Sequence, residues 1–200
     1  MTGIILAGGQ SIRMGKDKAS LPWSDSDLLN AKIYQLRSIF TDIIVVSNTP
    51  RKIDADIRVV TDIYPKMGPL GGIHAGLIAA RNPYAFVTAC DMPYFSANAV
   101  RYLCSNAEQW DITMPVHGEQ YYEPLFACYS KACIGAAEML FEKNIRRIID
   151  LFNLVRYKLI SQEDFRAFDP QLNIFSNINT ALDYQKALLE RPVPNNKEKS

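Results

Sequence analysis

The sequence lacks any long apolar run. None of its hydrophobic stretches approaches the roughly 18 to 20 residues that cross a membrane. Its first residues, from Met1 to Gly9, have no basic segment, and the apolar run among them is too short for a signal peptide. We therefore expect a protein of the cytoplasm that does not bind a membrane.

An excess of charge of one sign is also missing. The 22 lysines and arginines against 21 aspartates and glutamates leave a net charge of +1. No overall field attracts nucleic acid, so a bound polyanion has to be held by a local cluster of cations. The 4 cysteines have no metal-site spacing and the 2 histidines stand alone, which disfavours structural zinc. Reduced, mostly buried thiols fit a cytosolic chain.

What is present is the composition of a folded domain. Hydrophobic residues make up 48% of the 200 residues and charged residues 22%, a balance that excludes a disordered chain. This length predicts a single domain over residues 1–190. Residues 191–200, which contain two prolines and two asparagines, are expected to form a flexible tail.

Short apolar runs alternate with amphipathic segments in the first half of the chain. We predict strands over 2–7, 43–47, 57–61 and 84–89, and helices over 27–40 and 71–81. This alternation indicates β-α units that wind a parallel sheet in the right-handed sense. The predicted class is therefore α/β, a three-layer α/β/α fold with a mostly parallel, Rossmann-like sheet.

The pattern changes in the second half. We predict a helix over 96–107 with a serine N-cap, and strands over 111–116 and 121–129 joined by a hairpin-like connection. Helices over 131–143 and 146–152, a strand over 155–160 and a last helix from 177–180 to about 189 follow. The sheet is therefore expected to include an antiparallel C-terminal portion.

A glycine-rich, basic loop follows the first predicted strand, where open α/β sheets place their ligand crevice. Glycine lets main-chain amides turn toward phosphate oxygens, and lysine and arginine add positive charge. The loop holds three glycines, three cations and one carboxylate: Gly8, Gly9, Gly15, Arg13, Lys16, Lys18 and Asp17. It indicates a phosphate site, with a solvated turn as the alternative.

Two common phosphate motifs are excluded. The spacing from Gly9 to the Gly15-Lys16 pair is one residue too long for a P-loop, and Asp17 stands where a hydroxyl would coordinate magnesium. The dinucleotide fingerprint Gly-x-Gly-x-x-Gly is absent as well. The chain is therefore neither a P-loop NTPase nor an NAD-binding protein of the usual kind.

The loop does resemble the signature of the MobA-related nucleotidyltransferases, the molybdenum cofactor guanylyltransferases. That signature, Leu-Ala-Gly-Gly-x-Ser-x-Arg-Met-Gly-x-Asp-Lys, is reproduced without a gap from Leu6 to Lys18. Gly8 favours the guanylyl branch, since cytidylyl relatives usually have alanine there. The resemblance implies that Leu6, Ala7 and Gly8 line the guanine and ribose, that amides from Gly9 onward cradle the triphosphate, and that Arg13 and Lys18 hold it.

The same resemblance, which covers residues 2–189, assigns further site residues. Asp91 follows the strand 84–89 and is similar to the family's magnesium aspartate; read alone, it could be a turn or helix cap. Asp62 lies just ahead of a Gly-Pro-Leu-Gly-Gly segment like the one beside which relatives place a nucleotide-binding aspartate. Asn48 occupies the place of an asparagine near the base. The implied cofactor is Mg²⁺.

Residues of the second half resemble the family's acceptor side. Arg147, Asn177 and Asn179 match segments that face the pterin substrate, although an arginine on a solvated helix and an asparagine helix cap are the structural alternatives. The nucleotide-binding part is thus expected in residues 1–95 and the acceptor-binding part in 96–190. One departure is the segment 21–29, which lacks the glycine of the relatives' hairpin, so its conformation stays open.

The expected reaction is transfer of GMP from GTP to the terminal phosphate of molybdopterin, with release of pyrophosphate. A phosphate nucleophile is already ionised near neutral pH, which agrees with a loop that contains no cysteine or histidine. Catalysis by Arg13, Lys18 and Asp91 would then rest on alignment and charge neutralisation. The alternatives are transfer from CTP to molybdopterin, transfer to a sugar phosphate, and a nucleotide-binding regulator without turnover. Other proteins of molybdenum cofactor assembly are possible partners, and nucleic acid is not.

Overall fold

The computed structural model describes residues 1–8, 17–118 and 121–190. Its main strands are β1 (Thr2–Leu6), β4 (Ile43–Val46), β5 (Arg58–Val60), β6 (Tyr84–Ala89), β7 (Ile112–His117), β8 (Tyr121–Tyr122), β9 (Phe126–Ser130) and β10 (Tyr157–Ser161). A small hairpin is formed by β2 (Pro22–Trp23) and β3 (Ser26–Asp27). The tail 191–200 lies outside the described residues.

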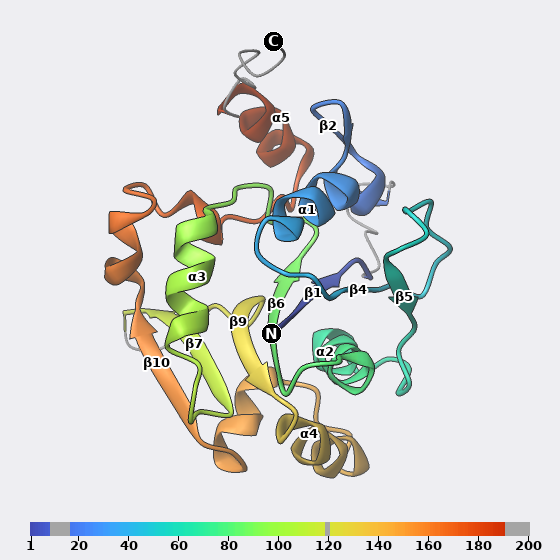
Figure 1. Cartoon of the computed structure of the whole chain (residues 1–200), viewed down its shortest axis with the longest axis vertical. Coiled ribbons are helices and arrows are strands. Elements are labelled where there is room, and N and C mark those ends of the chain that lie inside the picture. Colours follow the sequence, from blue (N-terminus) through green and yellow to red (C-terminus); the bar gives the residue numbers. More distant parts are fainter. Residues whose placement is uncertain (9–16, 119–120, 191–200) are drawn as a thin grey trace.

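Most of the helices lie between these strands along the chain, and the last one follows them near the C-terminal end (Figure 1). The α-helices are α1 (Leu28–Arg37), α2 (Gly68–Ala79), α3 (Ala97–Ser105), α4 (Cys133–Glu142) and α5 (Ala181–Glu190). Short 3₁₀ segments are η1 (Lys18–Ser20), η2 (Ile148–Asn153), η3 (Gln162–Ala167) and η4 (Asn173–Phe175). As predicted, Ser96 caps α3: its hydroxyl accepts a hydrogen bond from the Ala99 amide at 3.3 Å.

Within the described residues one 8-stranded sheet has the order β10-β7-β9-β6-β1-β4-β5, and β8 pairs with β7. Strands β1, β4, β5 and β6 run parallel, and β10 runs parallel to β7. Among the described strands of this sheet, β8 and β9 run opposite to the others: β9 is antiparallel to β6 and β7, and β8 is antiparallel to β7. The predicted fold class, mostly parallel with an antiparallel portion in the second half, is therefore confirmed.

The strand order reverses at β1, because the chain continues to β4 on one side and later returns to β6 on the other. Leu6 is in register with Val46 of β4 and with Ala89 of β6, so the three strands end at the same level. Open sheets bind ligands at such a switch point, beyond the carboxyl ends of the strands. The segments after β1 and β6 both start there.

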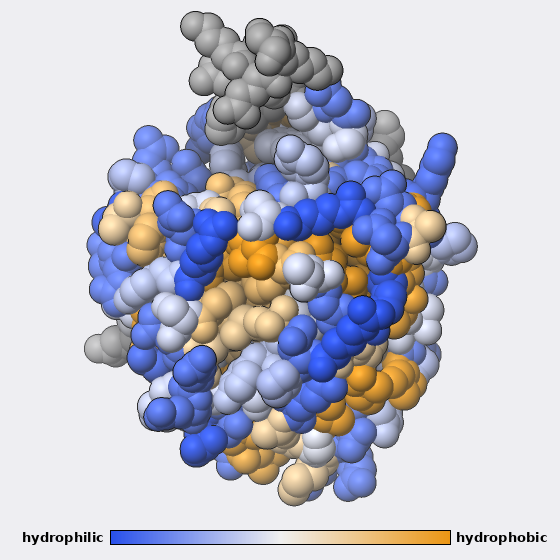
Figure 2. All heavy atoms as spheres, viewed as in Figure 1, coloured by the Kyte–Doolittle hydropathy of each residue, from blue (hydrophilic) through white to orange (hydrophobic). Residues whose placement is uncertain are grey.

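Side-chain alternation along the strands builds a core on each face of the sheet. In β1, Ile5 packs with residues of α1 and α3, whereas Ile4 and Leu6 pack with residues of α2 and α4 on the other face. The inner strands β1, β4, β6 and β9 are therefore buried on both sides, as continuous apolar runs such as Ile43–Val46 predict. The space-filling view of Figure 2 shows one side of the molecule. Its surface is mainly hydrophilic there, with hydrophobic residues near the centre of the view and over α2 and α4.

Helix α2 approaches β1 closely because glycine faces the strand. A Cβ atom added to Gly76 would lie 2.8 Å from a methyl of Ile4, and one added to Gly72 would lie 3.1 Å from a methyl of Leu6. The glycines of this helix thus serve close packing. As a result, the first turn of α2 and the residues just before it lie close to the end of β1.

The segment 21–29, whose conformation the sequence left open, forms the hairpin β2–β3. Ser24 adopts a positive φ of 55°, which takes the place of the missing glycine. Buried Leu21, Trp23 and Leu28 pack against Ile178 in a small third core, and this packing fixes the hairpin.

Three predicted elements differ in detail. The strand predicted over 121–129 is interrupted between β8 and β9, where Pro124 lacks the amide that a ladder needs. The helix predicted over 146–152 is the 3₁₀ segment η2, in which buried Ile148 and Leu151 share the three-residue spacing of that helix type. The last helix begins at Ala181, after the asparagines. Among the described residues we find no helix with the length and apolar character needed to span a membrane.

Candidate nucleotide site

Residues from three distant parts of the sequence meet beyond the carboxyl ends of β1 and β6. The Lys18 ammonium lies 3.0 Å from Oδ2 of Asp91 and donates a hydrogen bond to Oδ1 of Asn179 at 3.2 Å. The side chains of Lys18 and Asp91 are 16% and 22% exposed, so both remain open to a ligand. Lys18, the predicted phosphate cation, thus contacts both Asp91, the predicted metal carboxylate, and Asn179, a predicted acceptor residue.

Local structure holds these groups in place. The Asp17 carboxylate accepts a hydrogen bond from the Ala19 amide at 3.2 Å and so begins η1, the short turn that carries Lys18. Asp91 stands two residues beyond the last residue of β6, and its carbonyl accepts a hydrogen bond from the Ile178 amide at 2.8 Å. That bond places the segment with Asn179 beside Asp91.

Asn48 and Asp62 form a second polar pair at the same edge of the sheet. The Asn48 side-chain amide donates to Oδ2 of Asp62 at 2.8 Å, and its oxygen accepts from the Asp62 main-chain amide at 2.9 Å. The residues follow β4 and β5, neighbouring parallel strands that end together. The structure thus joins two predicted nucleotide-binding residues, whose contact with a nucleotide stays a prediction.

The remaining residues of the nucleotide loop are described only in part. Leu6 and Ala7 are buried and Gly8 is exposed, and among the described residues no atom lies within 4 Å of a Cβ added at Gly8. Gly9 and Arg13 lie outside the described residues. The predicted lining of guanine and ribose by residues 6–8 therefore stays a prediction.

The other acceptor-side residues are not brought to Lys18 by any contact that the structure describes. Arg147 is 73% exposed, and its guanidinium makes a two-pronged ion pair with Asp150 at 3.0 and 2.7 Å. This pair lowers the pKa of the Asp150 carboxyl. Asn177 is exposed, two residues before Asn179. Thr180 and Asp183, rather than the asparagines, make the reciprocal hydrogen bonds that begin α5.

Sequence reasoning missed Lys32, a buried cation beside the site. Lys32 is 3% exposed on the inward face of α1, and its ammonium lies 5.6 Å from the centre of the Phe95 ring. Burial lowers the pKa of Lys32 to about 8, and the nearby Cys90 and Asp91 oppose that shift. A signal existed in the sequence, since position 32 falls within the apolar stripe of positions 28, 29, 33 and 36.

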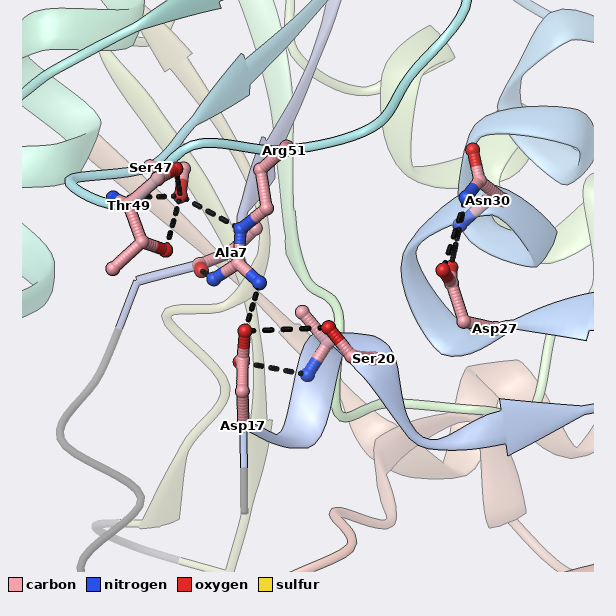
Figure 3. Close-up of polar contacts among 9 residues, drawn as sticks. Ala7, Asp17, Ser20, Asp27, Asn30, Ser47, Thr49 and Arg51 are labelled. Carbon is pink, nitrogen blue, oxygen red and sulfur yellow. Dashed lines mark hydrogen bonds and ion pairs between the residues drawn. The ribbon is translucent and has the colours of Figure 1, made fainter.

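Arg51 was missed as well, and no pattern in the sequence marks it. Figure 3 shows its guanidinium between Ser47, Ala7 and Asp17. It donates to the Ser47 hydroxyl at 2.9 Å and to the Ala7 carbonyl at 2.6 Å, and it forms an ion pair with Asp17. Its side chain is only 8% exposed. Arg51 therefore connects the ends of the two described segments that flank residues 9–16.

Cys90 is the thiol nearest to the candidate metal carboxylate, as its direct neighbour in the chain. Burial, reinforced by the charge of Asp91, raises the pKa of Cys90 to about 12. A thiol with such a pKa stays protonated near neutral pH and is a poor nucleophile. The site therefore offers positive charge, a carboxylate and amides, and no activated cysteine.

A lysine that contacts a carboxylate beyond the carboxyl ends of β1 and β6, in a chain whose sequence after β1 is rich in glycine, is the arrangement expected of a nucleotidyltransferase. The family described as "MobA-like NTP transferase domain" matches residues 3–158, and the chain belongs to this family.

Two curated relatives agree in more detail. "Probable molybdenum cofactor guanylyltransferase" of Pelotomaculum thermopropionicum is 38% identical over 187 residues, which cover 93% of this chain and 91% of the relative. "Molybdenum cofactor guanylyltransferase" of Desulfosudis oleivorans is 34% identical over 190 residues, 94% of each chain.

Solved structures support the fold. The molybdopterin-guanine dinucleotide biosynthesis protein A of Archaeoglobus fulgidus superposes with a TM-score of 0.81 at 24% identity, over 94% of this chain and 97% of that one. A 2-C-methyl-D-erythritol 4-phosphate cytidylyltransferase of Thermus thermophilus gives a TM-score of 0.68 at 14% identity, over 93% and 96% of the two chains. At these identities the likeness concerns the fold alone.

Proposed function

We propose that this chain transfers GMP from GTP to the terminal phosphate of molybdopterin and releases pyrophosphate. The observation that carries the proposal is the contact of Lys18 with both Asp91 and Asn179. It joins the nucleotide loop of the first half to a segment of the second half that is similar to the family's acceptor side. The names of the curated relatives support the choice of GTP and molybdopterin.

The reaction requires no covalent intermediate with the protein. A terminal phosphate oxygen of molybdopterin forms a bond to the α-phosphorus of GTP, and the bond from that phosphorus to the β-phosphate oxygen breaks. Pyrophosphate leaves with the electron pair. Because the attacking phosphate is already ionised, the chain has to align two anions and neutralise charge rather than supply a base. The protonated state of Cys90 agrees with this assignment.

Asp91 suits Mg²⁺ by its chemistry and position. Its carboxylate is a hard oxygen donor, partly exposed beyond the carboxyl end of β6, and only Oδ2 is engaged by Lys18. No group of three or more His, Cys, Asp or Glu side chains gathers among the described residues. Asp91 would therefore hold the ion together with substrate phosphates, as Mg²⁺ sites often do. When bound, Mg²⁺ would reduce the negative charge on the phosphates.

Lys18 supplies the fixed positive charge of the site. Its ammonium is held by two oxygens from distant segments, so it does not have to be ordered when the substrates bind. Such a preorganised charge stabilises negative charge that develops on the leaving pyrophosphate. Arg13 would add a second cation to the same group, as the resemblance implies.

The first test is calorimetric binding of GTP, CTP, UTP and ATP with Mg²⁺, followed by pyrophosphate release with molybdopterin. We expect a preference for GTP, and turnover that falls roughly 10²-fold or more in Asp91→Asn and Lys18→Ala, a loss typical of one preorganised charge. Preference for CTP would move the chain to the cytidylyl branch. Binding of GTP without turnover on any phosphorylated acceptor would indicate a regulator.

Two matched controls come from the amino end of β7 and from β10. Asp111 is a carboxylate of similar exposure, paired with Arg156, and Lys158 donates to the side chain of Asn106 at 2.9 Å much as Lys18 does to Asn179. Asp111→Asn and Lys158→Ala should keep wild-type turnover if folded. Equal losses in the controls and in the site variants would contradict the proposed roles of Asp91 and Lys18.

A further inference from the structure

Arg51 has no assigned role, yet its contacts reach both sides of the nucleotide loop. The guanidinium is held in one orientation by the buried hydroxyl of Ser47, which itself donates to the Thr49 carbonyl at 2.9 Å. From this position Arg51 contacts Ala7, just after β1, and Asp17, just before Lys18. A planar guanidinium with several donors can hold two oxygens at once, which a lysine ammonium does less well.

The contact with Ala7 fixes the direction of a main-chain amide. The Ala7 amide donates to the Val46 carbonyl at 2.9 Å and the Ala7 carbonyl accepts from Arg51, so both polar groups of this residue are used. In a trans peptide the carbonyl and the following N–H point in opposite directions. Because Arg51 holds the Ala7 carbonyl, the Gly8 amide is aimed away from Arg51. Gly8 is exposed, and among the described residues no atom lies within 4 Å of a Cβ added there, so none of them blocks a ligand beside this residue.

The contact with Asp17 changes the charge of the loop. Asp17 is the single carboxylate between Gly8 and Lys18, and unpaired it would repel a polyphosphate. The ion pair with Arg51 neutralises it. Asp17 also accepts hydrogen bonds from the Ala19 amide at 3.2 Å and the Ser20 hydroxyl at 3.4 Å. Holding Asp17 therefore holds the turn that presents Lys18.

We infer that Arg51 is a positioning residue of the nucleotide site: it fixes the direction of the Gly8 amide on the base side and, through Asp17, the position of the Lys18 ammonium on the phosphate side of one ligand. The inference rests on the proposed function, in which a nucleoside triphosphate occupies this crevice. It extends that function because it names Arg51 as the residue that links Ala7 and Gly8, on the base side, to Lys18, on the phosphate side. Arg51 acts through Ala7 and Asp17 and is not itself a catalytic residue.

The test compares the binding of GTP and of inorganic triphosphate, both with Mg²⁺, in the full chain. Arg51→Met should weaken both by roughly 10- to 100-fold, the range for loss of charge-assisted hydrogen bonds. Arg51→Lys keeps the charge and should recover only part of this loss. Asp17→Asn in the Arg51→Met background should restore part of the affinity, because it removes an unpaired carboxylate. In turnover, KM for GTP should rise more than kcat falls.

Arg58 offers a closely matched control. Its guanidinium also bridges a main-chain carbonyl and a carboxylate, with hydrogen bonds to Ala79 at 2.7 Å and Asp42 at 2.5 Å, but these contacts lie at the amino end of β4. Arg58→Met should lower the melting temperature and leave both affinities unchanged. Circular dichroism of each variant shows whether it is folded.

The two ligands separate the inference from the proposed function. If wild type binds triphosphate but not GTP, and Arg51→Met weakens triphosphate binding, the nucleotide assignment is wrong and the role of Arg51 stands. If folded Arg51→Met binds both ligands within twofold of wild type, or if Arg58→Met loses as much affinity, the role of Arg51 is overturned. Failure of wild type to bind either ligand would overturn both.

Discussion

Replacement of Lys32 by methionine should make the protein more stable at neutral pH. Lys32 is 3% exposed, and burial lowers its pKa from 10.5 to about 8. A lowered pKa means that the folded protein holds the charged ammonium less favourably than the unfolded chain does. Methionine has a similar volume and no charge, so the variant avoids this cost while it keeps most of the packing of this α1 position against Phe95.

The size of the effect follows from the pKa. One pKa unit corresponds to about 1.4 kcal/mol, so a shift from 10.5 to about 8 corresponds to a cost on the order of 3 kcal/mol below pH 8. Between these two pKa values the unfolded chain binds a proton that the folded protein has released. The stability of wild type therefore rises with pH through this window, relative to the variant. Above the pKa of the unfolded chain the cost is absent, because the amine is neutral in both states.

Urea unfolding of wild type and Lys32→Met between pH 7 and pH 10.5 measures this difference directly. We expect Lys32→Met to be more stable by up to about 3 kcal/mol at pH 7, with a gain that declines toward the alkaline end. Leu36→Met, on the same face of α1, is the control, and its effect should not depend on pH. A loss of stability in Lys32→Met that is the same at every pH would refute the reasoning.

Two further predictions concern packing and a partly buried acid. Gly76→Ala should destabilise the protein by about 1–3 kcal/mol in urea unfolding, because its Cβ would lie 2.8 Å from a methyl of fully buried Ile4. Gly135→Ala in α4 meets nothing within 4 Å and should instead stabilise by about 0.5–1 kcal/mol, and equal effects at both sites would contradict the packing argument. Burial raises the pKa of Glu123 from 4.5 to about 7, so the folded protein keeps a proton there that the unfolded chain releases, and stability falls as pH rises through this window. Glu123→Gln should therefore gain stability over wild type from pH 4.5 to 7 and then level off, and a pH-independent difference in thermal melts would rule this out.

Several features of the fold could be predicted because they depend on neighbouring residues. The four strands of the first half lie within a residue or two of their predicted ranges, since each is a short apolar run bounded by polar or turn residues. Ser96 caps its helix as its sequence position indicates. The residues after β1 and β6 could be placed at one edge because parallel strands end together.

Other features could not be predicted from local pattern. The hairpin at residues 22–27 forms without glycine because Trp23 packs against Ile178, which is distant in the sequence. The interruption between β8 and β9 depends on Pro124, and its extent is set by how the flanking strands pair with β7. The packing partner Ile178 and the pairing partner β7 both lie outside the segments whose conformation they set, so the local pattern of those segments does not contain them.

The sequence by itself determined the class of the fold and the family, and it predicted which residues bear the chemistry. These depend on periodicity and on a contiguous motif, which a single chain displays directly. Tertiary structure alone decided which of those residues meet. Lys18 bonds to Asn179 across the whole domain, Arg51 reaches Ala7 and Asp17, and Lys32 is buried beside Asp91. Contacts between distant segments arise from strand order and helix packing, and burial and charge pairing exist only once those segments are in place.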